Sequence, residues 1–244
     1  MREGKTRRSD IEENEASMLN HLIVKYDIER YPFARIVASH LKCSNLAAIH
    51  HVHQYPRFDC AIEQSTELHH RLYAIGKEFF DVYGRFIRDQ IAPMIGDEIV
   101  YQARPNFRFQ LPGNVAVSGF HRDRDNHHHT AEINFWVPLT PVSEHTAVWI
   151  ESSEGKQDFH PYVAQYGEIL VFDGANLMHG NVVNESQVTR FSFDFRAVPA
   201  RLFENTGMRS VNTEVPMSVG GYFAPLDLAP ARDIAASDAA CHVD

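Results

Sequence analysis

The first hundred residues show the spacing of apolar positions that is typical of helices. The pattern is clearest from Thr66 to Ile91, where apolar residues recur every three or four positions. This spacing predicts an amphipathic helix or a broken pair of helices, and Pro93 is expected to mark its end. We expect the apolar stripe to pack into the core rather than to bind a partner.

After about Arg104 the pattern changes to short apolar segments that alternate with turn residues. These segments are rich in β-branched and aromatic residues, as strands are. The expected strands are 106–111, 116–120, 131–137, 147–150, 168–172 and 189–196. Their regular spacing predicts a mainly β fold with flanking helices, a double-stranded β-helix of the jelly-roll, cupin-like kind.

The length fits one domain over residues 1–244. Within it we expect a mainly helical N-terminal part (1–103), a jelly-roll core (104–200), and a lid or packing segment with a tail (201–244). The last forty residues lack periodicity, and the Ala- and Asp-rich end from Ala229 is expected to be mobile.

Charge and cysteine content narrow the classes of function. The chain has 23 Lys and Arg against 32 Asp and Glu, a formal charge of -9, which disfavours nucleic acid as a partner. No apolar run is long enough to span a membrane, and the charged start lacks a secretion signal, so we expect a cytoplasmic protein. Cys43, Cys60 and Cys241 are widely spaced, which argues against a disulfide framework or a zinc finger. The sequence does not indicate the oligomeric state.

Two segments carry residues with the chemistry of metal ligands. His121 and Asp123 follow the expected strand 116–120, and residues two apart on a strand project to the same face. His179 lies fifty-six residues after Asp123, far enough for the chain to cross a barrel and return. Two histidines and one carboxylate leave three open positions on an octahedral ion, as in non-haem iron(II) oxygenases. Asp125 competes with Asp123 as the carboxylate ligand because it also follows His121 at even spacing. We favour Asp123, because the shorter spacing lets the two side chains bind one ion more closely.

The expected strand 189–196 adds a polar face. Alternation places Arg190, Ser192, Asp194 and Arg196 on one side and three phenylalanines on the other. Barrel interiors are normally apolar, so a polar inward face indicates a polar ligand. Arg190 presents a planar fork suited to a carboxylate, and Ser192 can add a hydroxyl donor. Arg196 is the alternative residue for binding the carboxylate.

Other polar and aromatic residues are open candidates for the pocket. For each of them, the alternative to lining the pocket is an ordinary structural role on the surface or in the core. They are Arg108 with Gln110, Glu132 with Asn134, Trp149, and the histidines 127–129.

Taken together, the motifs resemble a known family. The order His-x-Asp, distal His and Arg-x-Ser resembles iron(II)/2-oxoglutarate oxygenases, and the eleven residues from His179 to Arg190 are typical of the phytanoyl-hydroxylase branch. Over about residues 104–200 the chain is also similar to the StrG-like oxygenases of streptomycin biosynthesis. The segments that carry this similarity are 106–114, 120–123, 132–140, 149–152 and 189–196.

The resemblance implies iron(II) held by His121, Asp123 and His179. It also implies that Arg190 and Ser192 hold the distal carboxylate of 2-oxoglutarate, and Arg108 and Asn134 are further candidates for cosubstrate contacts. The family reaction consumes O2 and 2-oxoglutarate, releases succinate and CO2, and oxidises a C–H bond of the substrate.

The implied enzyme is a 2-oxoglutarate-dependent dioxygenase of antibiotic biosynthesis that acts on a small, sugar-like, cationic molecule. An aminoglycoside or aminocyclitol is expected, with hydroxylation or oxidative ring closure, such as orthoester formation, as the outcome. Acidic residues near the metal are candidates for holding the cation: Asp125, Glu132, Glu151 and Asp194. Two alternatives stay open: the same chemistry on an amino acid, and a cupin-like metal- or sugar-binding protein without oxidative chemistry.

Overall fold

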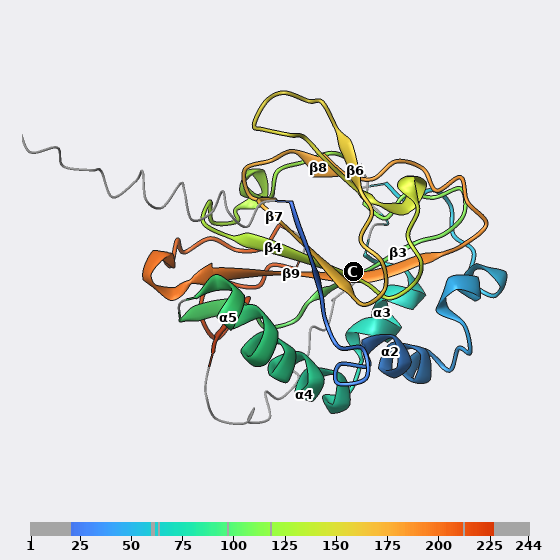
Figure 1. The fold of residues 1–244 in the computed structure, drawn as a ribbon, viewed down its shortest axis with the longest axis horizontal. Helices are drawn as coiled ribbons and strands as arrows, with labels where there is room; N and C mark the ends of the chain where they lie inside the picture. The colour runs from blue at the N-terminus through green and yellow to red at the C-terminus, as the bar shows by residue number, and fades with distance from the viewer. Residues whose placement is uncertain are drawn as a thin grey trace, which may run out of the picture.

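Two antiparallel sheets and a group of helices form the fold. The computed structural model describes residues 21–226 except 60, 61, 63, 97, 118 and 212. Helices lie against one face of the main sheet, and a small sheet lies on the other side (Figure 1). None of the helices in these described residues is long and apolar enough to cross a membrane.

The main sheet has the order β1-β7-β4-β9-β2-β10, with β3 also paired to β9. Its strands are β1 (Leu22–Lys25), β2 (Ile99–Gln102), β3 (Asn106–Gln110), β4 (Ile133–Pro138), β7 (Glu168–Phe172), β9 (Arg190–Pro199) and β10 (Phe223–Pro225). The small sheet has the order β6-β5-β8. Its strands are β5 (Val148–Ile150), β6 (His160–Tyr162) and β8 (His179–Gly180).

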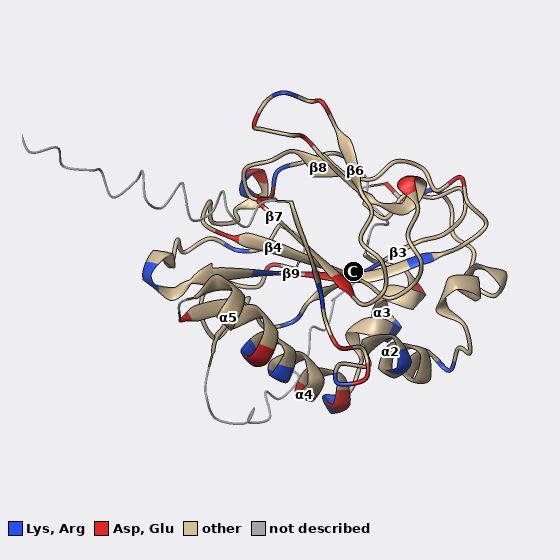
Figure 2. Ribbon diagram, viewed as in Figure 1, with Lys and Arg blue, Asp and Glu red and all other residues tan. Residues whose placement is uncertain are grey.

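The register brings polar residues of three strands together. Asn134 of β4 lies opposite Arg196 of β9, and Arg108 of β3 lies opposite Ser192 of β9. Because side chains alternate along a strand, these residues share the inner face of the main sheet. Charged residues therefore occur along β9 within the molecule, as Figure 2 shows.

The other face of β9 is apolar and packs against the helices. Phe191, Phe193 and Phe195 are all 0% exposed, and the ring of Phe193 lies 4.9 Å from that of Phe33 on α2. The expected division of β9 into a phenylalanine face and a polar face is confirmed. Burial of these aromatic rings holds the sheet to the helical layer.

The expected helical region 66–91 is a broken pair. Its elements are α3 (Glu67–Tyr73), α4 (Lys77–Phe86) and a π-helical turn η2 (Ile87–Ile91). The remaining α-helices of the described residues are α2 (Phe33–Leu41) and α5 (Ala92–Ile95), and short 3-10 helices include η1 (Leu46–His51), η4 (Glu144–Thr146) and η5 (Ala200–Leu202). The expected stop at Pro93 is wrong, because the chain stays helical to Ile95. The helix ends at Gly96, whose φ is 76°. Pro93 lies at the start of α5, directly after the π-helical turn η2.

Short strands were missed on both sides of the jelly-roll core. β1 and β2 lie in the region expected to be mainly helical, and β10 lies in the C-terminal packing segment. β10 pairs with β2, and Phe223 packs with Met217 and Val198, so this part of the C-terminal segment packs onto the sheet. The expected mobile tail, Cys60 and Cys241 fall outside the described residues.

The expected strand 116–120 is not a strand in its described residues. Directly after it, His121 forms a bridge with His179, and their backbone N–H and C=O groups exchange two hydrogen bonds of 2.9 Å. Asp123 then opens a 3-10 turn, η3 (Asp123–Asn126). His121 and Asp123 are therefore brought together by a bridge and a turn, not by strand alternation.

Candidate metal centre and cosubstrate pocket

The three predicted ligands meet at one point. His121, Asp123 and His179 each offer a ligand atom, and these atoms lie within 4.8 Å of one another. Nε2 of His121 lies 3.4 Å from Oδ1 of Asp123, and Nε2 of His179 lies 3.8 Å from the same oxygen. Ligand atoms that lie about 2 Å from one ion are about 3 Å apart. A small inward shift of these side chains would therefore let the three atoms bind one divalent cation. Asp125, the competing carboxylate, is not in this group.

Both imidazoles are oriented by backbone carbonyls. Nδ1 of His121 lies 3.1 Å from the oxygen of Gly119, and Nδ1 of His179 lies 3.1 Å from the oxygen of Leu177. A carbonyl can only accept, so each Nδ1 carries the proton and each Nε2 keeps its lone pair. This is the usual way in which an outer contact fixes the tautomer of a metal-binding histidine.

The second oxygen of Asp123 is held by nitrogen donors. Oδ2 accepts hydrogen bonds from Nδ2 of Asn134 at 2.7 Å and from Nε and Nη2 of Arg196 at 3.0 and 2.8 Å. Asp123 is 2% exposed and Arg196 is 4% exposed. Oδ1 is left to face the histidines, so the carboxylate is set up to bind a metal through one oxygen.

The electrostatic surroundings keep Asp123 and His179 in metal-binding form, whereas His121 is more easily protonated. Burial raises the pKa of Asp123, but Arg196 and the hydrogen bond from His121 outweigh it, so that pKa lies well below its usual value. Burial lowers the pKa of His179 to about 4, which keeps its ring neutral at neutral pH. Burial also lowers the pKa of His121, but Asp123 more than compensates, so a metal would compete with a proton at that ring.

Arg190 lies at the polar end of the same pocket, and Ser192 is hydrogen-bonded to it. The lining residues include His121, His179, Asn134, Trp136, Arg108, Arg190, Asp194 and Arg196. Arg190 donates to the oxygen of Thr146 at 3.1 Å, to Oγ of Ser192 at 2.8 Å and to Oε1 of Gln110 at 3.2 Å. Two of its five N–H groups remain for a ligand.

The hydroxyl of Ser192 is also directed by its neighbours. Its oxygen accepts from Arg190 and from Nε1 of Trp136, the latter at 3.0 Å, so its own proton is free to donate elsewhere. Burial and the nearby charge of Arg108 lower the pKa of Arg190 to about 9, which leaves it a cation at neutral pH. This end of the pocket therefore offers a buried cation and a hydroxyl donor, the chemistry that a carboxylate needs.

Several other candidates have structural partners instead. Arg196, the alternative residue for binding the carboxylate, holds Asp123, and Gln110 supports Arg190. Trp149 donates from Nε1 to the oxygen of Glu144 and is not among the residues that line the pocket, where Trp136 is the tryptophan. In the run 127–129, Nδ1 of His128 bonds to Oε2 of Glu132 at 2.7 Å, which ties the loop after Asp123 to the start of β4.

Gly174 is a site residue that sequence reasoning did not select. An ideal Cβ at this position would lie 2.5 Å from Nδ2 of Asn134, and its backbone oxygen accepts the N–H of Asp123 at 2.9 Å. The absence of a side chain thus lets Asn134 reach Asp123. The only sequence signal is the Asp-Gly turn after β7, which resembles many ordinary turns.

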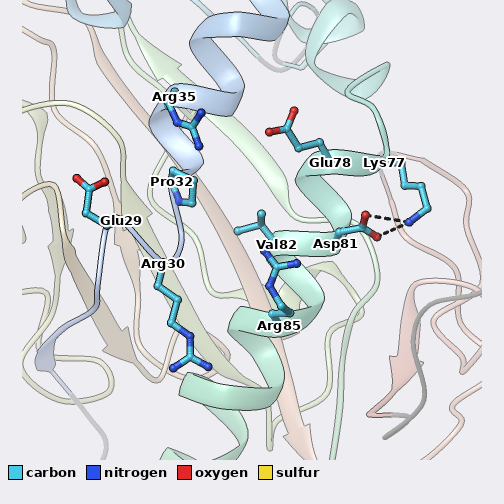
Figure 3. A pocket seen from close by; sticks show the side chains of 9 residues that line it. All are labelled: Glu29, Arg30, Pro32, Arg35, Lys77, Glu78, Asp81, Val82 and Arg85. Atoms are coloured by element: carbon cyan, nitrogen blue, oxygen red, sulfur yellow. Dashed lines mark hydrogen bonds and ion pairs between the residues drawn. The ribbon is translucent and has the colours of Figure 1, made fainter.

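A second hollow lies on the surface between the start of α2 and α4 (Figure 3). It is lined mainly by charged residues: Glu29, Arg30, Arg35, Lys77, Glu78, Asp81 and Arg85, with Pro32 and Val82. Lys77 pairs with Asp81 at 2.6 Å. Among the described residues the metal-ligand trio lies in the other pocket, so this hollow is not the candidate active site.

Comparison with models of known protein families gave no match. The chain is 35% identical over 209 residues to the streptomycin biosynthesis protein StrG of Streptomyces griseus, and the match covers 84% of this chain and 98% of StrG. The chain belongs to the StrG family. The part of the chain that matches StrG includes more than the segments that suggested the resemblance.

Two solved structures share the fold of this StrG-family protein. The carbocyclase SnoK of nogalamycin biosynthesis has a TM-score of 0.51 and 10% identity, with 80% of this chain and 85% of SnoK covered. The epimerase SnoN of the same biosynthesis has a TM-score of 0.51 and 13% identity, with 90% of this chain and 100% of SnoN covered. Both are described as non-haem α-ketoglutarate-dependent enzymes. At these identities the likeness concerns the fold alone, and it confirms the expected double-stranded β-helix.

Proposed function

We propose that this StrG-family protein is an iron(II)- and 2-oxoglutarate-dependent dioxygenase. It oxidises a C–H bond of a small polar natural product, an aminoglycoside or aminocyclitol, by hydroxylation or by oxidative ring closure. In this proposal His121, Asp123 and His179 hold the iron, and Arg190 and Ser192 bind the distal carboxylate of 2-oxoglutarate.

One observation carries the proposal: a facial set of two histidines and one carboxylate shares a pocket with a buried arginine. The two Nε2 atoms and Oδ1 of Asp123 face one another, and Arg190, at 1% exposure, lines the same pocket. A cupin-like binding protein without oxidative chemistry has no use for Arg190, because an unpaired buried cation is costly. A dianionic cosubstrate gives it a partner.

Bound iron(II) would activate O2 with two electrons from 2-oxoglutarate, and the chain supplies position. Each turnover consumes one O2 and one 2-oxoglutarate, which is oxidised to succinate and CO2. One oxygen atom enters succinate, and the other enters the product as a hydroxyl or leaves as water when a ring closes. Asn134 and Arg196 hold Oδ2 of Asp123, so that the carboxylate would bind the metal through Oδ1 alone. Arg190 orients the cosubstrate in a mostly buried pocket.

The substrate class is supported by the relative. StrG is a streptomycin biosynthesis protein, and streptomycin is an aminoglycoside. This supports a sugar or aminocyclitol substrate in antibiotic biosynthesis over an amino acid. Products would show the outcome, because hydroxylation adds an oxygen atom whereas ring closure removes two hydrogens.

The proposal is tested by O2-dependent formation of succinate from 2-oxoglutarate in the iron-loaded protein. Asp123→Ala should abolish it, because one of three ligands is lost. Asp125→Ala is a matched control, because Asp125 lies two residues further along, has a 53% exposed side chain and pairs with Arg122. Full activity in Asp123→Ala, or no succinate from folded, iron-loaded wild type, would contradict the proposal.

A further inference from the structure

A buried glutamate lies behind the metal ligand His179. Glu151 directly follows β5 and is 0% exposed, which puts it out of reach of a cationic substrate. Its backbone N–H donates to the oxygen of Met178 at 3.0 Å, and Oε1 of its side chain accepts the N–H of Met178 at 2.7 Å. Glu151 therefore holds both backbone polar groups of the residue that precedes His179.

Glu151 is a carboxylate at neutral pH. Burial raises its pKa, but the backbone N–H groups of Met178, Gln157 and Gly155 outweigh burial, so the pKa lies below its usual value. Oε2 accepts the N–H of Gln157 at 3.0 Å, so each oxygen has a donor, as a buried charge requires. A negative charge therefore lies 2.7 Å from the peptide nitrogen of Met178.

The N–H of Met178 and the carbonyl of Leu177 belong to the same peptide group. On the other side of this group, the carbonyl oxygen lies 3.1 Å from Nδ1 of His179. One line of hydrogen bonds thus runs from the carboxylate of Glu151 through the peptide group to the imidazole. Hydrogen bonds in such a chain polarise one another, so the charge of Glu151 makes the carbonyl a stronger acceptor. Nε2 of His179 then becomes a stronger ligand for a metal.

The other histidine of the centre differs in this respect. Nδ1 of His121 lies 3.1 Å from the oxygen of Gly119. The N–H of that peptide group belongs to Phe120, and no carboxylate among the described residues accepts it. The two histidines therefore have similar carbonyl partners, but only the partner of His179 is backed by a buried charge in this part of the chain.

We propose that Glu151 is a positioning residue of the metal centre, which acts on His179 through the peptide group between Leu177 and Met178. It fixes the ring by holding the carbonyl that the ring donates to, and it strengthens the ring as a ligand by polarising that carbonyl. Carboxylates that bond directly to metal-binding histidines act in the same way, and here one peptide group lies between them. This inference rests on the metal centre of the proposed function, not on its oxidative chemistry.

Nitrogen NMR of the histidine rings tests the inference in protein loaded with zinc(II), a diamagnetic substitute for iron(II). The ring of His179 is recognised by its proximity to the ring of Phe172, whose centroid lies 5.1 Å away. In the wild type, the Nδ1 resonance of His179 should lie nearer to the imidazolate range than that of His121. Glu151→Gln keeps the shape of the side chain but removes its charge. It should move the His179 resonance away from that range and leave the His121 resonance unchanged.

Metal affinity gives a second measurement, with a control for loosening of the loop between β5 and β6 (151–159). The control is Asp158→Ala, because Asp158 accepts the N–H and the hydroxyl of Ser152 at 2.9 and 2.7 Å and so fastens this loop away from Met178. Glu151→Gln should raise the Kd for iron(II) about tenfold, whereas the control should stay within about twofold of the wild type. Both variants should lose stability in urea, so stability alone does not separate the two roles.

Three results would overturn the inference: the same Nδ1 position for both histidines in the wild type, an unmoved His179 resonance in Glu151→Gln, or equal losses of iron affinity in Glu151→Gln and Asp158→Ala. The wild-type comparison needs no variant, so it decides even if Glu151→Gln fails to fold. A wild type that binds no metal would contradict both this inference and the proposed function. Metal binding with the expected spectrum but without succinate formation would contradict the proposed function alone.

Discussion

Gly174→Ala should damage the metal centre from outside the ligand set. An ideal Cβ would lie 2.5, 2.6 and 2.9 Å from Nδ2, Cγ and Oδ1 of Asn134. Ordinary contacts are about 3.5 Å or longer, so the amide must retreat by about 1 Å. Its hydrogen bond to Asp123, now 2.7 Å, would then be broken.

Two opposing terms set the magnitude. Loss of a hydrogen bond to a buried charged group costs about 1.5–3 kcal/mol, whereas Gly to Ala at a residue without positive φ stabilises by about 0.4–1 kcal/mol. The free energy of unfolding of Gly174→Ala should therefore fall by about 1–2 kcal/mol. Iron(II) affinity should fall about tenfold, as it does when an outer contact of a ligand is lost.

Urea unfolding and iron(II) titration measure the two effects. In an Asn134→Ala background the clash disappears, so Gly174→Ala should cost nothing further there. Gly84→Ala on α4 is the matched control, because its Cβ meets nothing within 4 Å, and it should raise stability by about 0.5–1 kcal/mol. Unchanged iron affinity in Gly174→Ala, or additive losses in the double variant, would refute this reasoning.

Three further predictions follow from other parts of the structure. Ser192→Ala should raise the Kd for 2-oxoglutarate about tenfold and leave iron(II) affinity within about twofold, because the hydroxyl would donate to the carboxylate and accepts from Arg190 and Trp136 but bonds to none of the three metal-ligand side chains; a parallel loss of iron would contradict this role. Burial lowers the pKa of His69 to about 3, so the unfolded state binds the extra proton below about pH 6.5 and stability falls as pH falls. Between about pH 7.5 and about pH 5 the wild type should lose about 2 kcal/mol more than His69→Gln in urea unfolding, and equal losses would refute this. Iron(II) at about 100 times its Kd should stabilise the wild type by about 2.7 kcal/mol in thermal unfolding, and Asp123→Ala should show no such shift.

The sequence was most informative where chemistry and periodicity coincide. The alternation along β9 predicted both the phenylalanine face and the polar face, because a ten-residue strand has a strong period of two. The residues His121, Asp123 and His179 could be selected by type and spacing, although the described residues of 116–120 do not form the expected strand. The bridge to His179 orders that segment, and such long-range pairing leaves no local pattern.

What could not be predicted depends on register between distant strands. Arg196 holds Asp123 because β9 places it opposite Asn134 of β4. The spacing from His179 and the neighbouring Ser192 favoured Arg190 over Arg196 for the carboxylate of 2-oxoglutarate, but the role of Arg196 beside Asp123 follows only from the pairing. β1, β2 and β10 were missed for a similar reason, since strands of three or four residues are stabilised by their partners rather than by their own composition.

Anaerobic titration of the iron(II) protein with 2-oxoglutarate tests the central claim most directly. A visible charge-transfer band should appear as the chelate forms in the wild type, and Arg190→Ala should require far more 2-oxoglutarate to reach the same band. No band in folded, iron-loaded wild type, or an unchanged titration curve in Arg190→Ala, would contradict the account.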